Sequence, residues 1–296
     1  MREEMGRSKG FTLVELLVAM LMGGVVIAAI YTTFNAQRQS YYEQDEVTQM
    51  QQNLRAALDM MSREIRMAGY NPTNEATCPG IVVATPGRLQ IRMDKNIVGS
   101  DIGDTDCADA DEDLTFGFDS TEDATLDGIA DTGAAAPAND GVASLGVLNS
   151  NVSANFVDMA EFIHAVGFAY AYDANGDGDL ETYTLTSGSN AGATEIIWAY
   201  HDAVTGNWFN LDNDGNGVID SADAAGATIV GTDTTDAFNL EDIRAVRIWV
   251  LARTESEDRE YTNSNTYTVG LNVITPNDHF RRRLLETIVR IRNMGF

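Results

Sequence analysis

"GFTLVELLVAM", residues 10–20, begins the apolar segment that decides how this chain is organised. From Phe11 to Ile30 the only charged side chain is Glu15, and about 20 consecutive apolar residues are enough to cross the hydrocarbon core of a bilayer as a helix. A charge in such a segment costs on the order of 3 kcal/mol at mid-bilayer and less near the edge. Two interpretations of Glu15 stay open: a charge tolerated near the interface, or a carboxylate whose partner is supplied by another molecule.

The residues on either side of this segment predict its orientation. Positive charge precedes it, at Arg2, Arg7 and Lys9, and the sequence after Ile30 soon turns acidic. The positive-inside rule therefore places residues 1–10 in the cytoplasm and the rest of the chain outside. No small-residue cleavage site of the A-x-A type follows the segment, which distinguishes it from an ordinary secretory signal.

A helical pattern continues beyond the apolar segment. Apolar residues recur at steps of three or four, at Val47, Met50, Leu54, Ala57, Met61, Ile65 and Ala68. This spacing forms one face of a helix, which Gly69 and Pro72 then end. The sequence thus predicts a helix over 11–30 that must be buried in lipid or in other subunits, and that continues as an amphipathic helix over 31–69.

From residue 70 onward, short apolar runs and alternating patterns replace the helical spacing. The runs are GIVVAT, RLQIRMD, LTFGFD, HAVGFAYAYD, EIIWAYHD, IRAVRIWVLAR, TYTVGLNVIT and RLLETIVRIRN. Strands and helices do not alternate, so we expect an antiparallel β-sheet packed on the second half of the helix, which is an α+β fold. The globular head is then 70–296, and its acidic, glycine-rich stretch at about 100–151 is predicted to be an insertion.

The charge balance argues against nucleic acid as a partner. The chain has 19 Lys and Arg against 45 Asp and Glu, a formal net charge of −26. A nucleic-acid-binding surface needs clustered cations that replace the counterions of the phosphates. The one basic cluster comprises Arg281, Arg282, Arg283, Arg290 and Arg292. A solvated strand face and a contact with an acidic neighbour both remain open for it.

Catalytic patterns do not emerge from the sequence. The three histidines, His164, His201 and His279, have no metal-ligand spacing such as H-E-x-x-H. The stretch "TSGSNAG" at 186–192 is not a nucleophile elbow. No enzymatic activity is therefore expected.

The segment from Gly10 to Met20 resembles the class III signal of type IV pilins and type II secretion pseudopilins. The resemblance implies a pilin-like fold in which 11–30 is the transmembrane or filament-core helix. In that family a short basic leader ends in Gly, followed by Phe and then by Glu five residues into the mature chain. The resemblance implies that a prepilin peptidase cleaves between Gly10 and Phe11 and N-methylates Phe11. It also implies that Glu15 pairs with the N-terminal ammonium of a neighbouring subunit, so that the subunits assemble in register.

Three further segments resemble PilW-type minor pilins: residues 53–72, 243–254 and 280–296. The resemblance implies a minor pilin that primes or caps a type IV pilus. Before assembly it would span the inner membrane once with its N-terminus in the cytoplasm, and afterwards it would lie at the cell surface. Its partners would be other minor and major pilins, the prepilin peptidase and the inner-membrane assembly platform. A pseudopilin of type II secretion and a calcium-dependent adhesive head displayed on a filament are the alternatives.

The stretch "DNDGNGVIDSAD", residues 212–223, has the spacing of an EF-hand-type calcium loop. The expected ligands at positions one, three, five, seven, nine and twelve are Asp212, Asp214, Asn216, Val218, Asp220 and Asp223. Gly217 supplies the sharp turn at position six, and Asp223 stands where a longer Glu is usual. Calcium is the expected cofactor, and a solvated Asp/Asn/Gly turn is the alternative.

A second stretch, "DANGDGDLE" at 173–181, matches the first half of such a loop. Its candidate ligands are Asp173, Asn175, Asp177, Asp179 and Glu181. Thr184 falls at position twelve and offers no carboxylate, so calcium binding and a simple hairpin turn both stay open. A third acidic stretch, 104–113, has no recognised spacing and is predicted to be a solvated loop.

Cys78 and Cys107 are the only cysteines and lie on the predicted exported side, where disulfides persist. A bond between them would close a loop of roughly 30 residues and contribute about 3–4 kcal/mol in the chain-entropy model. Two separate thiols are the alternative.

Overall fold

A computed structural model of the chain describes residues 11–72, 78–95, 97–98, 101–102, 107, 109, 111–131, 141–149, 156–202, 206–223, 228–232 and 239–294. The chain divides into two compact units between Thr48 and Gln49. The first unit contains the apolar segment, and the second contains the sheet and the acidic loops 173–181 and 212–223.

Helix α1, Leu13–Met67, contributes to both units. It begins with a reciprocal capping box, in which the backbone N–H of Glu15 donates to Thr12 Oγ1 (3.3 Å) and that of Thr12 donates to Glu15 Oε2 (3.0 Å). The large apolar side chains of the first unit, from Leu13 to Phe34, are exposed. The expected long N-terminal helix is confirmed.

The C-terminal end of α1 is held by residues that lie far away in the sequence. Gly69 adopts a left-handed conformation (φ +73°), which lets its N–H donate to the carbonyl of Arg92 at 2.8 Å. The side-chain amide of Asn293 donates to the carbonyl of Met67 at 3.3 Å. The helix therefore ends on polar partners from both ends of the head.

Within the second unit one face of α1 is buried. Its buried residues are Met50, Leu54, Ala57, Leu58, Met61 and Ile65. They include the predicted apolar stripe from Met50 onward, and Ala68 just after the helix is buried as well. The helical spacing therefore identified the face that packs in the head.

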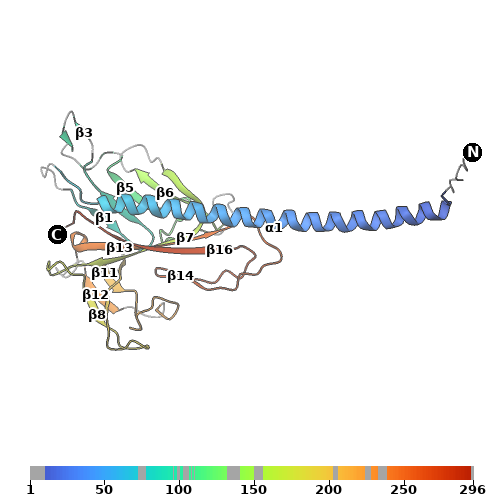
Figure 1. Ribbon diagram of the computed structural model, residues 1–296. Helices are drawn as coiled ribbons and strands as arrows, with labels where there is room; N and C mark the ends of the chain where they lie inside the picture. The colour runs from blue at the N-terminus through green and yellow to red at the C-terminus, as the bar shows by residue number, and fades with distance from the viewer. Residues whose placement is uncertain are drawn as a thin grey trace, which may run out of the picture. The chain divides into compact units, whose positions relative to one another are not determined.

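An antiparallel sheet forms the head, with the order β1-β2-β5-β6-β7-β10-β11-β12 and with β13 joining β7 to β16 (Figure 1). Its strands are β1 (Ile81–Ala84), β2 (Leu89–Arg92), β5 (Asp113–Gly117), β6 (Ala143–Asn149), β7 (Phe156–Tyr172), β10 (Ala199–Asp202), β11 (Asn207–Asn210), β12 (Thr228–Thr232), β13 (Ile243–Arg253) and β16 (Arg282–Arg290). The separate pairs are β3 (Ile97–Val98) with β4 (Asp101–Ile102), β8 (Thr182–Thr184) with β9 (Thr194–Ile196), and β14 (Tyr267–Val269) with β15 (Asn272–Ile274), and a 3₁₀ helix, η2, spans Leu240–Asp242. The expected α+β class, a long helix packed on an antiparallel sheet, is confirmed.

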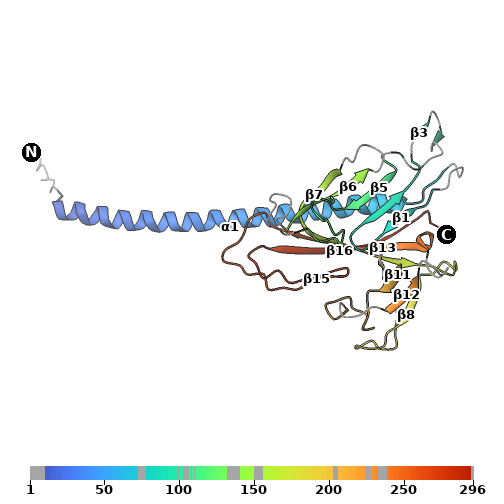
Figure 2. The same ribbon diagram turned by 180° about the vertical axis from the view of Figure 1, so that it is seen from behind.

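The sheet is buried on both faces around β13. Successive side chains of a strand point to opposite faces, so even-numbered and odd-numbered residues of β13 report on different faces. Val246, Ile248 and Val250 are buried on one face. Trp249 and Leu251 belong to a cluster on the other face, which contains no residue of α1. Figure 2 shows the C-terminal turns of α1 and the β14–β15 hairpin on opposite sides of β13 and β16.

Several elements differ from the sequence prediction. "TYTVGLNVIT" is a hairpin rather than one strand, because Gly270 (φ +58°) turns the chain between β14 and β15. "EIIWAYHD" is divided between β9 and β10, since the N–H of Ile197 leaves the strand to bond the carbonyl of Glu181. Strands β5 and β6 lie inside the stretch 100–151 and pair with each other, so these parts of the expected insertion belong to the sheet.

Candidate functional site

The loop 212–223 follows β11 and gathers three carboxylates. Asp212 and Asp223 are buried, with 6% and 7% of their surface exposed, and Asp214 is exposed. One oxygen from each of the three side chains lies within 4.8 Å of the others, a distance that a single cation can span. Carboxylate oxygens are the ligands that hard cations such as Ca²⁺ prefer. The residues present therefore fit a metal ion.

Asp212 organises the first half of the loop. Its Oδ1 accepts the backbone N–H of Gly215 (2.8 Å) and of Asn216 (3.1 Å), and its Oδ2 accepts that of Gly217 (2.6 Å). Gly217 has φ +84°, which favours glycine and agrees with its predicted turn position. The hydroxyl of Tyr183 also donates to Oδ2 of Asp212. The turn conformation is thus built around the side chain at position one.

Asp223 closes the other end of the loop. Its Oδ1 accepts the N–H of Asn213 (2.8 Å) and of Asp214 (3.3 Å), and its Oδ2 accepts that of Asp220 (2.8 Å). Burial raises the pKa of Asp223, these three donors oppose the rise, and the charge of Asp212 adds to it. Bringing these carboxylates together thus costs electrostatic free energy, which a bound cation would offset.

The remaining predicted ligands lie in the loop but outside the three-carboxylate group. Asn216 donates its side-chain amide to Asp214 Oδ2 (2.9 Å) and accepts the N–H of Val218 at Oδ1 (2.6 Å). Asp220 accepts the N–H of Ala222 (2.7 Å). These are turn contacts of the kind that shape a tight Asp/Asn/Gly loop.

A neighbouring hairpin supports the loop and was not predicted from the sequence. The N–H groups of Thr186 and Ser187 donate to the carbonyl of Gly215 (3.0 and 3.1 Å), and the hydroxyl of Ser187 donates to that of Asp214 (2.9 Å). Together with Tyr183, these residues come from β8 and the turn after it, and no spacing in the sequence reveals so distant a contact.

The second acidic loop, 173–181, has the turn bonds of its first half only. Buried Asp173 accepts the N–H of Gly176 (2.7 Å) and of Gly178 (3.0 Å). Asn175 and Asp177 each accept the N–H two residues on, at 2.8 and 2.9 Å. In the part of the chain that the structure describes, the three-carboxylate group includes no residue from this loop, so Asp179 and Glu181 do not complete a comparable cluster.

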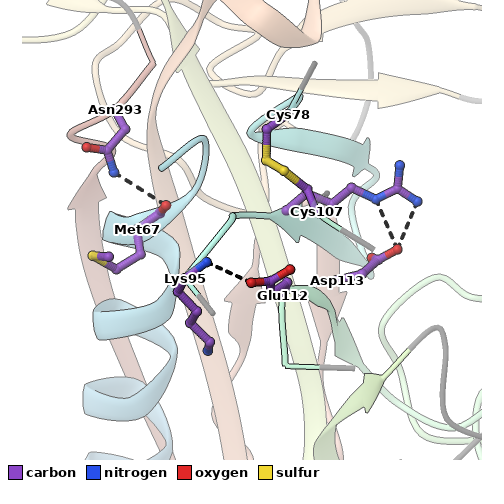
Figure 3. Close-up of a disulfide and its surroundings, with 8 residues drawn as sticks. Met67, Cys78, Lys95, Cys107, Glu112, Asp113 and Asn293 are labelled. Carbon is purple, nitrogen blue, oxygen red and sulfur yellow. Dashed lines mark hydrogen bonds and ion pairs between the residues drawn. A yellow bond between two sulfur atoms is a disulfide. The ribbon is translucent and has the colours of Figure 1, made fainter. Parts of the chain in front are cut away.

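The two cysteines are joined by a disulfide, Cys78–Cys107, with Cα atoms 5.8 Å apart (Figure 3). Next to it, buried Asp113 accepts two hydrogen bonds from the guanidinium of Arg92 (2.8 and 3.0 Å). The backbone N–H of Lys95 donates to Glu112 at 2.7 Å. The disulfide therefore ties the segment before β1 to the segment before β5, beside the ion pair that joins the last residue of β2 to the first residue of β5. The prediction of a solvated loop over 104–113 is wrong at Glu112 and Asp113, which are buried.

Part of the basic cluster is structural. The guanidinium of Arg282, with 1% of its side chain exposed, donates to both oxygens of Asp278 (each 2.6 Å), and its Nε donates to His164 Nδ1 at 3.0 Å. Burial lowers the pKa of His164 to about 4, and the charges of Arg282 and Arg253 act in the same direction. Burial alone would raise the pKa of Asp278, but the hydrogen bonds and charge of Arg282 lower it overall.

Other arginines of that cluster have different surroundings. Arg281 donates to Asp258 at 2.6 and 3.0 Å, whereas Arg290 and Arg292 are exposed. Val289, on the opposite strand face, is buried, as the alternation predicts. The cluster is therefore divided between ion pairs within the head and an exposed strand face.

The first unit contains the residues expected to act in processing and assembly. Gly10 lies outside the described residues, and Phe11 is 87% exposed just before α1. Glu15 has local partners, because it also accepts the hydroxyl of Thr12 at 3.0 Å. The T-x-x-E spacing of Thr12 and Glu15 is the sequence signal of such a capping box, and the interpretation of Glu15 from the sequence did not use it. Among the residues that the structure describes, one helix, α1, is long and apolar enough to cross a membrane by length and composition.

Comparisons with known proteins agree with this layout. A family described as Type IV Pilus-assembly protein W, PilW, matches residues 139–293, and one described as the prokaryotic N-terminal methylation motif matches residues 5–31. A similar solved structure is the type IV-like pilin TTHA1219 from Thermus thermophilus, with 14% identity over 83% of this chain and 97% of that chain and a TM-score of 0.36. No curated protein matches the sequence.

The two family matches carry the assignment. The prepilin-like motif and the apolar helix together suggest membrane anchoring, and membership of a pilus family implies interaction with other pilus components. Family and fold point to a structural pilin rather than an enzyme. Because the PilW match spans just over half of its residues, the chain belongs to the type IV pilus-assembly protein W family and is a type IV pilin-like protein.

Proposed function

We propose that this chain is a minor pilin that primes or caps a type IV pilus. Residues 11–30 hold it in the inner membrane with its N-terminus in the cytoplasm, and after assembly it lies in the pilus at the cell surface. The match of residues 5–31 to the N-terminal methylation motif carries this proposal, since the PilW match alone does not describe an anchor. The exposed apolar side chains of the first unit support it, because they need lipid or other subunits around them.

Processing follows from the same segment. A prepilin peptidase cleaves between Gly10 and Phe11 and methylates the new N-terminus. The capping box supports this boundary, because α1 begins two residues after Phe11 and a removed leader takes no part of the helix with it.

Glu15 sets the register between subunits in this proposal. Its oxygens accept hydrogen bonds from Thr12 alone among the described residues, which leaves acceptor capacity for an ammonium group. An ion pair between Glu15 and the N-terminus of the next subunit would form only when the two apolar helices align. The partners are other minor and major pilins and the inner-membrane assembly platform, and nucleic acid is not expected to bind.

The loop 212–223 binds calcium and stiffens the exported head. The EF-hand-type spacing, the buried pair Asp212 and Asp223 and the turn at Gly217 support this assignment. Extracellular modules bind calcium with dissociation constants of about 10⁻⁴–10⁻³ M, so even a weak loop fills outside the cell. The loop 173–181 is a second and weaker candidate, because its carboxylates do not converge in the same way.

Mass spectrometry of sheared filaments and of membranes tests the function. A peptide that begins at N-methyl-Phe11 in the filament fraction is the expected result. Processed protein found only in membranes would favour a type II secretion pseudopilin instead. An intact Met1 in every fraction would contradict the proposed processing and anchoring together.

A further inference from the structure

The second unit contains a cleft of about 700 Å³ that is separate from both acidic loops. Four segments surround it: the turn between β1 and β2, strand β10, the loop 125–127 and the turn of the β14–β15 hairpin. Its volume lies in the range of sites for small ligands, which are concave, largely pre-formed and few per protein. None of the roles proposed above uses this cleft.

The floor of the cleft is the outer face of β1, β2 and β5. Val83 pairs with Gln90, and Gln90 pairs with Thr115, so these three side chains lie together on one face. Leu89 and Ile91 point to the opposite face, where they are fully buried. The floor is therefore a mixed polar and apolar surface on the side of these strands that does not form the core.

One wall is an aromatic side chain held in place by another. The ring of Tyr200 lies 5.4 Å from that of Phe209. Burial raises the pKa of the Tyr200 hydroxyl, and the charge of Asp202 raises it further. The hydroxyl is thus protonated at neutral pH, and its ring offers a flat apolar surface with a polar tip.

The rim is pre-formed by buried Asp123. This carboxylate accepts the N–H of Asp127 (3.2 Å) and of Gly128 (2.9 Å), and the side-chain amide of Asn272 donates to the carbonyl of Asp127 at 2.8 Å. Leu126 consequently adopts φ +57°, which is strained for a non-glycine residue. Strain of this kind persists where the surroundings over-determine it, and ligand clamps are among the places where it accumulates.

The polar groups of the cleft carry both signs of charge. Arg88 is the cationic residue of the lining, and Asp127 and Asp202 are its two carboxylates. A strongly anionic or cationic ligand would therefore meet repulsion from one of them. Planar groups such as guanidinium, carboxylate and amide match the paired hydroxyls of a sugar, because each hydroxyl both donates and accepts. The apolar surfaces of Tyr200, Leu126 and Leu271 match the C–H faces of a pyranose ring.

We infer that this cleft binds a neutral oligosaccharide, with Tyr200 under a sugar ring and with Arg88 and Asp127 on its hydroxyls. The head of this chain then recognises a glycan surface. This inference depends on the second unit alone and holds whether the chain assembles into a pilus or a pseudopilus.

Glycan binding by the full chain tests the inference. The protein is solubilised in a zwitterionic detergent, since glycoside detergents would themselves occupy a sugar site. An array presents neutral, sialylated and sulfated oligosaccharides, together with peptides of similar length, and dissociation constants of the hits are measured by calorimetry. Binding of one or more neutral oligosaccharides is expected.

Two substitutions on one hairpin provide the matched comparison. Leu271 (39% exposed) lines the cleft, whereas Val273 (37% exposed) lies on the same hairpin outside it. Leu271→Trp should fill the cleft and weaken binding at least tenfold, while Val273→Trp should leave the dissociation constant unchanged. Asp127→Asn keeps the acceptor for the N–H of Ile129 and should weaken binding several-fold through loss of the charge-assisted bond.

Three outcomes would overturn the inference. The first is an absence of neutral hits, and the second is equal binding by the wild type and Leu271→Trp when both have the same melting temperature. The third is binding only of peptides or anionic glycans that Leu271→Trp abolishes, which would show a site for a different class of ligand.

Discussion

Glu15 is tied to Thr12 by hydrogen bonds in both directions, so two physical roles coincide in one carboxylate. One role is local, because the capping box satisfies free N–H groups at the start of α1. The other, proposed above, is electrostatic and needs a neighbouring subunit. The two roles separate under substitution, because a glutamine keeps the capping oxygen and removes the charge.

Glu15→Gln and Glu15→Ala are therefore expected to be exported and inserted normally. Both should be at least about tenfold less abundant than the wild type in sheared filaments. The reason is that the N-terminal ammonium of the neighbouring subunit would be buried without a partner, which costs several kcal/mol. Quantitative immunoblots of filament and membrane fractions measure this ratio. Thr12→Val is the control, because it weakens the cap and retains the carboxylate. Normal incorporation of Glu15→Gln would show that capping alone explains the residue.

His164 makes the stability of the head depend on pH. Its pKa is lowered to about 4 from an ordinary 6.5, so between these values the unfolded chain binds the proton more readily and acid favours unfolding. The free energy of unfolding should fall as pH drops from 6.5 towards 4. His164→Gln, which still accepts from Arg282, should show a shallower fall in urea titrations of the full chain in detergent at pH 7, 5.5 and 4.5.

Exposed His279 provides the comparison for that experiment. His279→Gln should reproduce the wild-type slope. Parallel curves for the wild type and His164→Gln would contradict the assignment of the slope to His164. The neutral state also fixes the tautomer, because Nδ1 accepts from Arg282 and the ring proton must then lie on Nε2.

At this scale the sequence predicts residues whose partners are close in the chain. The ligand spacing from Asp212 to Asp223 and the start of α1 near Phe11 are local patterns, and the structure contains the corresponding turn and helix start. Tyr183 and Arg282 bond to Asp212 and His164 across 29 and 118 residues, and no periodicity encodes such contacts.

At the scale of elements, the loop 212–223 and the β8–β9 hairpin behave as one piece, because Thr186 and Ser187 bond directly to the loop backbone. Ordering the loop with a cation should therefore order the hairpin too.

Calcium at about 10 mM, roughly a hundred times a dissociation constant of about 10⁻⁴ M, should raise the melting temperature of the head by roughly 5–10 °C. Differential scanning calorimetry with calcium, with magnesium and with chelator measures the shift. Asp212→Asn and Asp223→Asn should abolish it, whereas Glu241→Gln, an exposed charge in η2, should not. If the calcium-dependent rise in melting temperature persists in Asp223→Asn, calcium does not bind at 212–223. If the rise is lost in Asp177→Asn, calcium binds at 173–181.

The disulfide constrains a loop with a sequence separation of 29 residues. Replacing both cysteines by serine should lower the free energy of unfolding by about 3–4 kcal/mol in the chain-entropy model. Urea unfolding of the full chain in detergent, with and without reductant, measures the difference. Because Cys78 and Cys107 are the only cysteines, reductant should leave the serine variant unchanged. Equal stability of the oxidised and reduced wild type would contradict the expected contribution.

Strand prediction succeeded where an apolar run was long and failed where a turn interrupted the run. The run 243–253 became β13 with the predicted bounds. The hairpin of β14 and β15 was read as one strand because Gly270 alone marks its turn. Short strands such as β11 and β12 carry too few residues for a periodic signal, and their pairing with each other stabilises them instead.

At the scale of the whole molecule, the two units bury apolar surface in different ways. The second unit covers its own core on both faces of the sheet, whereas the apolar side chains of the first unit are exposed. The hydropathy of the sequence changes along α1 in the same sense, from apolar on every side over 11–30 to one apolar face further on. The sequence did not predict the cleft, since the cleft is formed by four segments that are far apart in the sequence.

The bond between Asn293 and Met67 joins residues 226 positions apart, and this separation has a consequence in time. At a synthesis rate of about 5–20 residues per second, the ribosome needs roughly 10–45 s after Met67 to reach Asn293, the hydrogen-bond partner at the end of α1. Throughout that interval the helix exists without its final contact. The anchor proposed above is therefore complete, and can enter the bilayer, long before the last residues of the head are made.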